Sequence, residues 1–314
     1  MANLSGSNMT NKVSGTALEE QMHLSVPVQV SLATNMIINI ITCPFAVVLN
    51  ILVILAVKRR PRLQTNANIL LACLAATDAM NGLLVQPSLI AWIILKSLSM
   101  NEEKTVLTFH NSALGGWLLC SSLHLLLITF ERLLAIKFTI HYPYIVTKNN
   151  IKVAVIAFWI TTLFSETTVM VTDKTIIANL LVVLALFSCI VFISISYVLL
   201  YRETRRHERR IKAQQLPLEQ VKRFANESKA FKTTVYVVGA VVLCFLPAAV
   251  FLVVVLSGVF LLTQSSLFLV YSPFIRTCGI LNSLLNPLIY CWRQKEMRKF
   301  IFRFSVVQAV HPTN

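Results

Sequence analysis

The sequence predicts an all-α membrane protein, a bundle of seven transmembrane helices followed by a short amphipathic eighth helix. Hydrophobic residues make up 56% of the 314 residues and charged residues only 13%, whereas soluble domains carry about a quarter charged residues. Seven apolar runs are long enough to cross the ~30 Å hydrocarbon core of a bilayer as helices, which takes ~20 residues. The net charge of +15 lies between these runs, without the aromatic-basic motif of a nucleic-acid module, so no nucleic-acid partner is expected.

The apolar runs are separated by shorter polar connections. Because backbone N–H and C=O groups must be paired internally in lipid, each run is expected to be helical. The runs lie at 33–57, 67–95, 106–136, 151–171, 176–201, 231–258 and 264–291. The chain is therefore divided into an N-terminal tail (1–32), a seven-helix transmembrane domain (33–291), a membrane-surface helix (292–304) and a C-terminal tail (305–314).

The membrane-surface helix is predicted from its own spacing. Met297, Phe300, Ile301 and Phe304 recur at helical intervals among Lys and Arg residues. A basic amphipathic helix of this kind lies along the membrane surface with its apolar side in the lipid. Membrane lipid is therefore an expected partner.

The distribution of Lys and Arg predicts the orientation. One set of connections holds 23 of these residues and the opposite set holds five, and positive charge accumulates on the cytoplasmic side. The N-terminal tail is therefore expected outside, in the plasma membrane, with glycosylation at the sequons of Asn3 and Asn8. A third sequon, at Asn226, falls on the cytoplasmic side, so the sequons support the orientation without establishing it.

Several polar side chains lie within the runs, where they are costly and usually face the bundle interior. They are one carboxylate and several neutral oxygen donors: Asn50, Asp78, Ser121, Asn282, Ser283 and Asn286. Oxygen ligands of this kind suit a small hard cation. The same residues could instead form a hydrated hydrogen-bond cluster that tightens helix packing, and the pattern alone does not decide between the two.

Short motifs follow one another in a recognisable order. The seventh run ends in Asn286-Pro287-Leu288-Ile289-Tyr290, the third in Glu131-Arg132-Leu133, the sixth contains Cys244-Phe245-Leu246-Pro247, and the fourth contains Trp159. With Asn50 and Asp78, these residues are similar to the N-P-x-x-Y, D/E-R-Y and C-W-x-P motifs of rhodopsin-like (class A) G-protein-coupled receptors. The chain thus resembles that family from about residue 40 to 304. The resemblance implies a receptor that binds an extracellular ligand and activates a heterotrimeric G protein by outward movement of the sixth helix.

The resemblance also implies roles for individual residues. Arg132 would contact the G protein when active and pair with Glu131 at rest, and Glu227 would close a latch with Arg132. The other implied switch residues are Tyr197, Tyr290, Asn286, Pro287, Phe245 and Pro247. The family's allosteric sodium pocket would map onto Asp78, Ser121, Asn282, Ser283 and Asn286.

The chain departs from the family pattern at several positions. Leu133 replaces a tyrosine, Phe245 replaces a tryptophan, and Leu107 stands where an outer disulfide cysteine is expected. The second outer loop is very short and has no cysteine. Several members of the melanocortin, lysosphingolipid, cannabinoid and adenosine receptor branch share such losses, and the chain resembles that branch weakly. Ile280 stands where a retinal protein has its lysine, so no retinal is expected.

The outer half of the bundle is mostly apolar, which suits a lipid or a small peptide ligand. The candidate ligand contacts are Arg276, Asn111, Leu114, Tyr271 and Phe251. Arg276 needs a partner at its depth. That partner is either Glu166 or Asp173 in a structural ion pair, which the sequence slightly favours, or an anionic group of the ligand.

Two other classes of protein were weighed. A transporter or channel predicts internal repeats and several midplane charges, whereas the chain has no repeat and Asp78 is the single acid deep in a run. An enzyme is not expected, because the sequence has no nucleophile motif, metal triad or phosphate loop.

Overall fold

The elements of the computed structural model are helical throughout the part of the chain that it describes. The structure describes residues 25–138, 141–172, 187–188, 191–192, 194–196, 198–199, 201–203, 205–206, 233, 235–247, 250 and 265–310. The elements are α2 (Val26–Arg59), η1 (Pro61–Leu63), α3 (Asn66–Met80), η2 (Asn81–Val85), α4 (Gln86–Ser97), α5 (Glu103–Lys137), α6 (Tyr142–Ile145), α7 (Lys148–Thr172), α11 (Ser265–Arg293) and α12 (Lys295–Val310). A further apolar helical stretch covers Val235–Pro247.

Four of the described helices are long and apolar enough to cross a membrane. They are Val26–Arg59, Asn66–Ser97, Glu103–Ala135 and Leu267–Arg293. These helices contain the predicted first and second runs, and nearly all of the third and the seventh. The first begins at Val26, seven residues ahead of its run, with a proline in its first turn where no backbone N–H is needed. α7 covers the predicted fourth run, Val235–Pro247 covers part of the sixth, and most of the fifth lies outside the described residues.

The second span contains one irregular turn. Residues Asn81–Val85 form a π-helical turn between α3 and α4. Pro87 follows it at the start of α4 and cannot donate a backbone hydrogen bond, which is a common cause of such a widening. Gly82 lies in this turn, where an added Cβ would come within 2.8 Å of Val47 Cγ2. Only glycine lets the turn approach α2 this closely.

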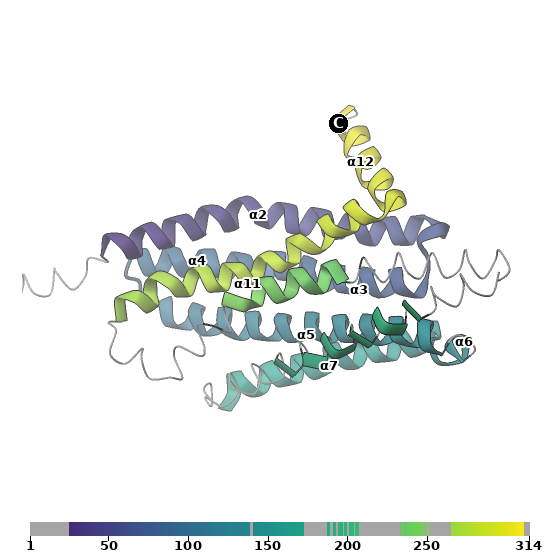
Figure 1. The fold of residues 1–314 in the computed structure, drawn as a ribbon. Helices are drawn as coiled ribbons and strands as arrows, with labels where there is room; N and C mark the ends of the chain where they lie inside the picture. The colour runs from purple at the N-terminus through teal and green to yellow at the C-terminus, as the bar shows by residue number, and fades with distance from the viewer. Residues whose placement is uncertain are drawn as a thin grey trace, which may run out of the picture.

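The helices lie side by side as an elongated bundle (Figure 1). α2 packs against α3, α4 and α11, and α5 packs against α3, α4 and α7. Many outward-facing side chains are large and apolar, among them Ile37, Phe45, Val153, Ile160 and Leu163. Such exposed apolar surface marks contact with a membrane.

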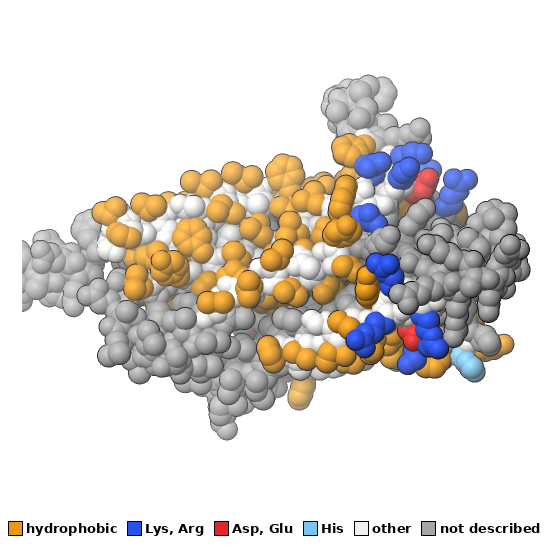
Figure 2. All heavy atoms as spheres, in the orientation of Figure 1, with side chains coloured by type: hydrophobic (Ala, Val, Ile, Leu, Met, Phe, Trp, Pro, Cys, Tyr) orange, Lys and Arg blue, Asp and Glu red, His pale blue; other side chains and the backbone are white. Residues whose placement is uncertain are grey.

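Charged side chains gather at one end of the bundle. In Figure 2 the Lys and Arg side chains cluster at the end where α12 leaves α11, while hydrophobic side chains cover most of the remaining described surface. We call this the basic end, which includes η1, α6 and α12, and the other, where α4 ends and α5 begins, the opposite end. α12 turns away from α11 at the basic end (Figure 1) and buries Met297, Phe300 and Ile301. A helix, α12, is therefore present where the surface helix was predicted, beginning three residues later and ending six residues later. Its placement on the membrane surface stays a prediction.

Candidate functional site

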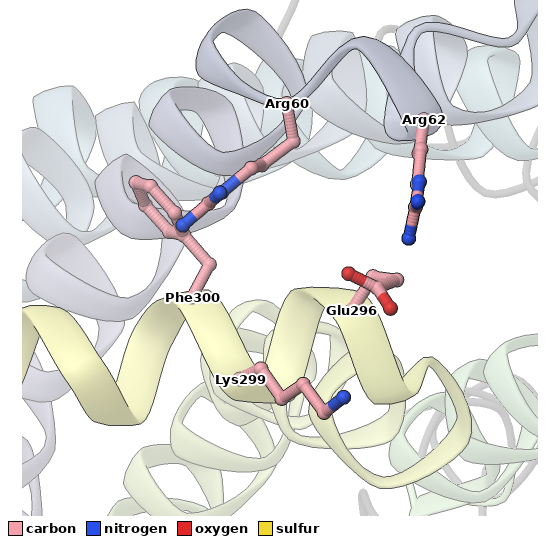
Figure 3. Close-up of a pocket in the computed structure, with 5 residues that line it drawn as sticks. All are labelled: Arg60, Arg62, Glu296, Lys299 and Phe300. Atoms are coloured by element: carbon pink, nitrogen blue, oxygen red, sulfur yellow. The ribbon is translucent and has the colours of Figure 1, made fainter.

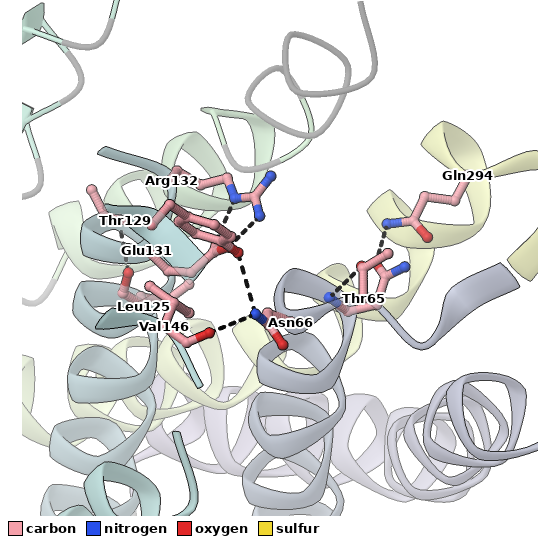
Figure 4. A network of polar contacts seen from close by, with 10 residues as sticks. Thr65, Asn66, Leu125, Thr129, Glu131, Arg132, Val146 and Gln294 are labelled. Carbon is pink, nitrogen blue, oxygen red and sulfur yellow. Dashed lines mark hydrogen bonds and ion pairs between the residues drawn. The ribbon is translucent and has the colours of Figure 1, made fainter. Parts of the chain in front are cut away.

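A buried ion pair lies on the last turns of α5, at the basic end. The guanidinium of Arg132 donates from Nε and Nη2 to the two carboxylate oxygens of Glu131, both at 2.5 Å (Figure 4). Glu131 is only 2% exposed and Arg132 only 5%. A charge buried to this degree is stable only when it is paired, so the two residues that the sequence places next to each other neutralise each other.

α6 adds a third member to this pair. The Tyr142 hydroxyl donates to Glu131 Oε1 at 2.5 Å, and Asn66 of α3 donates to the backbone carbonyl of Val146 at 2.9 Å (Figure 4). Asn66 Nδ2 also lies 3.5 Å from the Tyr142 hydroxyl. Burial, and then the negative charge of Glu131, raise the pKa of Tyr142 well above its ordinary value. The phenol therefore keeps its proton, and it joins α6 to α5 as a donor to Glu131 and to α3 as an acceptor from Asn66.

A polar cluster lies in the middle of the bundle around Asp78. Asn286 Nδ2 donates to Asp78 Oδ2 at 2.7 Å, joining α11 to α3. Asn81 Nδ2 donates to the Ser283 hydroxyl at 2.5 Å, and Asn50 Nδ2 donates to the Ser283 backbone carbonyl at 2.9 Å. All five residues are at most 4% exposed. The structure thus brings together three of the five residues predicted for a sodium pocket, namely Asp78, Ser283 and Asn286.

The remaining two residues of the predicted pocket are buried without joining this network. Ser121 is 5% exposed and Asn282 is 2% exposed, and their oxygens have no hydrogen-bond partner among the described residues. The side-chain carbonyl oxygens of Asn50, Asn81 and Asn286 also lack partners. Unsatisfied buried oxygens are uncommon and call for a cation or water. A set of oxygen donors around one carboxylate fits a small hard cation.

Asn81 belongs to this cluster although the sequence reasoning did not select it. It lies three residues after Asp78, so both side chains fall on the same face of a helix. That spacing could have identified it.

Apart from the Glu131–Arg132 pair and Asn286 of the central cluster, the described switch residues are buried, except for Pro247, which is exposed. Tyr290 is fully buried and Phe245 is 7% exposed, and both belong to one hydrophobic cluster. The Tyr290 hydroxyl is buried and has no hydrogen-bond partner among the described residues. Pro287 lies within α11, and Pro247 ends the described stretch of the sixth run. Glu227 and Tyr197 lie outside the described residues.

At the opposite end, Arg276 of α11 meets two residues from other helices. Its Nε donates to Asn111 Oδ1 at 3.2 Å, and its guanidinium carbon lies 5.3 Å from the centre of the Trp92 ring. The Nη1 atom is buried and has no partner among the described residues. Arg276 and Asn111, two predicted ligand contacts, are therefore neighbours.

The predicted ion pair between Arg276 and Glu166 is not formed. Glu166 of α7 instead accepts a hydrogen bond from the Ser112 hydroxyl at 2.5 Å, and its side chain packs over Gly116. That part of the prediction was wrong, because Glu166 lies between α7 and α5 rather than beside α11. The alternative partner, Asp173, lies outside the described residues.

Further buried groups lie near Arg276. The Ser88 hydroxyl donates to the Val85 carbonyl at 2.8 Å, so the 2.9 Å contact between Ser88 and His110 Nδ1 requires the imidazole to donate. His110 Nε2 and the indole N–H of Trp92 then have no partner among the described residues.

The other predicted ligand contacts differ in their surroundings. Leu114 packs against the apolar cluster that contains Trp92 and Leu89, whereas Tyr271 is 56% exposed. Phe251 and the sequon residues Asn3 and Asn8 lie outside the described part of the chain.

Comparison with known protein families identifies the bundle. A sequence model of the family described as "7 transmembrane receptor (rhodopsin family)" matches residues 49–176 and 164–290. These matches take in more than half of the chain, including the second to seventh predicted runs. The predicted fold class is therefore confirmed, and neither an enzyme nor a transporter is retained as an interpretation. The chain belongs to the rhodopsin family of seven-transmembrane receptors, which bind ligands and signal through G proteins.

Proposed function

We propose that this receptor binds a ligand with an anionic group, a lipid or a small peptide, at the outer end of its bundle. On binding, it activates a heterotrimeric G protein by outward movement of the sixth helix. The proposal uses the predicted orientation, with the N-terminus outside at the plasma membrane and the basic end in the cytoplasm. The excess of Lys and Arg at the basic end supports that orientation.

The single observation that carries the ligand proposal is the environment of Arg276. Its buried Nη1 has no partner among the described residues, while Nε is held by Asn111 and the guanidinium lies over Trp92. These contacts orient a planar fork that can bind a carboxylate or phosphate through two hydrogen bonds. Apolar residues such as Leu89, Ile93 and Ile280 lie close to Trp92, which favours an apolar ligand with one charged group.

The carboxylate that the sequence favoured as a structural partner is engaged elsewhere, since Glu166 accepts from Ser112. This geometry favours the ligand-anchor interpretation of Arg276 over the structural ion pair. The weak resemblance to the melanocortin and lysosphingolipid branch is compatible with it, and assignment to that branch stays a prediction.

The cytoplasmic switch is proposed to work through the pair of Glu131 and Arg132. In the described arrangement the guanidinium is held by Glu131, and Tyr142 holds that carboxylate in turn. Release of Arg132 would free five donors for a G protein. Glu227 is proposed as a second acid that holds Arg132 at rest, and Tyr197 and Tyr290 as residues that move inward on activation.

A hollow beside this switch supports docking of the G protein there. Leu134, Phe138, His141, Tyr144 and Ile145 line a cavity of about 400 Å³ at the basic end. Tyr144 is 81% exposed and Phe138 is 44% exposed. An exposed apolar hollow is a common form of protein-binding surface.

The cluster around Asp78 is proposed as an allosteric sodium site. Asp78, Ser283 and Asn286, with Ser121 and Asn282, would supply the oxygens, and a bound cation would supply positive charge to balance the carboxylate. Asn81 and Asn50 would orient the ligands from the neighbouring helices. This arrangement would stabilise the helix packing of the resting state.

The experiment is a G-protein dissociation assay in cells with a panel of anionic lipids and small peptides. The wild-type receptor should respond to at least one member. Arg132→Ala should abolish the response without loss of surface expression, since it removes the coupling group. Arg276→Ala and Arg276→Lys should both weaken the response, whereas Glu166→Gln should respond like the wild type. A full response by Arg276→Ala would refute the anchor, and a full response by Arg132→Ala would refute the switch.

A further inference from the structure

A small charged pocket lies between η1 and the start of α12, outside every site described above. Arg60, Arg62, Glu296, Lys299 and Phe300 line a cavity of about 190 Å³ (Figure 3). Three of these side chains are cations and one is a carboxylate. In Figure 3 Arg62 extends from η1 toward α12, and Glu296 extends from α12 toward it. The lining therefore has a positive excess.

The cations of this pocket form no ion pair with a described carboxylate. The ion pairs in the described part of the chain involve Lys96, Arg132 and Arg206, and none includes Arg60, Arg62 or Lys299. Arg60 lies over the Phe300 ring, 5.5 Å from its centre, a contact that holds the guanidinium in place and leaves its donors available. Like charges held close together favour a bound anion between them.

The position of the pocket indicates where that anion comes from. α12 buries Met297, Phe300 and Ile301 against the bundle, while Trp292 is 59% exposed and Phe302 is 63% exposed. Exposed aromatic and apolar residues beside Lys and Arg are typical of a helix lying in the headgroup layer. The pocket therefore opens where lipid headgroups lie.

The size and charge of the pocket narrow the range of ligands that it can bind. Sites for whole drug-sized molecules are about 300 Å³ or more, so about 190 Å³ suits one polar headgroup. Clusters of four to eight Lys and Arg at the cytoplasmic surface favour polyanionic lipids. The last turn of α2, η1 and the start of α12 supply such a cluster, namely Lys58, Arg59, Arg60, Arg62 and Lys299.

We propose that this pocket binds the headgroup of a phosphoinositide of the inner leaflet, with phosphate groups between Arg60, which links α2 to η1, Arg62 of η1 and Lys299 of α12. Guanidinium forks bind phosphate through two hydrogen bonds, and the Lys299 ammonium adds a point charge. Glu296 opposes binding and limits the site to ligands with more than one phosphate. The inference goes beyond the proposed function and shares with it the cytoplasmic placement of α12.

The experiment measures lipid binding directly. The purified full-length receptor is placed in nanodiscs of phosphatidylcholine, and binding of a fluorescent phosphatidylinositol bisphosphate is titrated. The double variant Arg62→Gln/Lys299→Gln should bind about 25-fold more weakly, at about fivefold for each cation near the membrane surface. Glu296→Gln should bind more tightly, because it removes the carboxylate of the pocket.

The matched control is Lys295→Gln/Arg298→Gln, which removes two charges from the same helix outside the pocket lining. This control should retain most of the affinity for the lipid. An equal loss of affinity in both double variants would mean that the lipid is held only by general electrostatic attraction to the basic helix, and would overturn the proposal. Equal binding of phosphatidylserine at the same charge density would also overturn it. If soluble inositol trisphosphate displaces the fluorescent lipid at the same concentration as the lipid itself, the site is assigned to a free headgroup.

This assay does not depend on the proposed function. It needs neither an agonist nor a G protein, so failure of the ligand or switch proposals would leave its result unchanged. Each substituted side chain of the pocket is exposed, and the unfolding midpoint of each variant checks that it folds.

Discussion

The carboxylate of Asp78, a residue only 1% exposed, lies among side-chain oxygens that have no hydrogen-bond partner in the described part of the chain. We predict that Asp78→Asn removes the effect of sodium on stability while leaving the fold intact, because asparagine can still accept from Asn286. For the wild type, a cation at ten times its Kd would stabilise the folded state by about 1.4 kcal/mol. The unfolding midpoint of the solubilised receptor, measured in NaCl and in KCl at equal ionic strength, checks this. If sodium has the same effect on Asp78→Asn as on the wild type, the sodium role is contradicted and only the role in helix packing remains.

Gly116 gives a second prediction for a single residue. An added Cβ would lie 2.5 Å from Glu166 Cγ, so Gly116→Ala should force Glu166 away from Ser112 and loosen α5 from α7. Overpacking of this kind costs about 1–3 kcal/mol, which a lower unfolding midpoint would report. Gly239→Ala is the matched control, since nothing lies within 4 Å of its Cβ. Gly116→Ala/Glu166→Ala should recover stability, and failure to recover would contradict the assigned clash.

The short helix α6 gives a prediction at the scale of one element. Of its four residues, Tyr142 is the one that forms a hydrogen bond with the Glu131–Arg132 ion pair in the described structure. Tyr142→Phe should raise basal G-protein activation, because Glu131 then loses the donor that holds it in place. A hydrogen bond to a charged group is worth about 1.5–3 kcal/mol, so a shift of about tenfold or more is expected. Basal activation of Tyr142→Phe equal to that of the wild type would contradict the role.

The pH dependence of this contact follows from the direction of the pKa shift. Because the pKa of Tyr142 is raised by burial and by Glu131, its contribution is fully present below its unfolded pKa, about 10. It is lost only as the pH rises through the higher folded value. The difference between Tyr142→Phe and the wild type should therefore be the same at pH 6 and pH 8.

The sequence predicted the spanning helices well, because length and hydropathy decide them. The predicted run 67–95 became Asn66–Ser97, and 264–291 became Ser265–Arg293. The start of the first helix was missed because Gln29 and Ser31 interrupt the apolar run. In the folded bundle Ser31 donates to the Val270 carbonyl of α11 at 2.6 Å, and such a partner is invisible in local spacing.

The candidate sites were predictable only in part. Glu131 and Arg132 are adjacent in sequence, so their pairing required no fold. The partner of Arg276 depends on which face of α7 meets α5. Of the two acids that the sequence offered, Glu166 contacts Ser112 instead, and Asp173 lies outside the described residues. Tyr142 and Asn81 were missed because their partners come from other helices, Glu131 on α5 and Ser283 on α11.

For the whole molecule, stability is predicted not to depend on disulfides. Six of the seven cysteines, Cys43, Cys73, Cys120, Cys244, Cys278 and Cys291, are free in the described part of the chain. The bundle is instead joined by helix packing and by polar contacts between helices, such as Asn286 with Asp78 and Asn39 with Thr277. A reducing agent does not break those contacts.

Dithiothreitol should therefore change neither the unfolding midpoint nor the G-protein response. The chemical check is maleimide labelling of the denatured receptor followed by intact mass measurement. Since the chain has seven cysteines, seven labels should be added with or without prior reduction. A single disulfide would remove two thiols and leave five labels before reduction, with recovery of the other two afterwards. That result, together with a lower unfolding midpoint in dithiothreitol, would show a covalent restraint on the bundle and overturn the prediction.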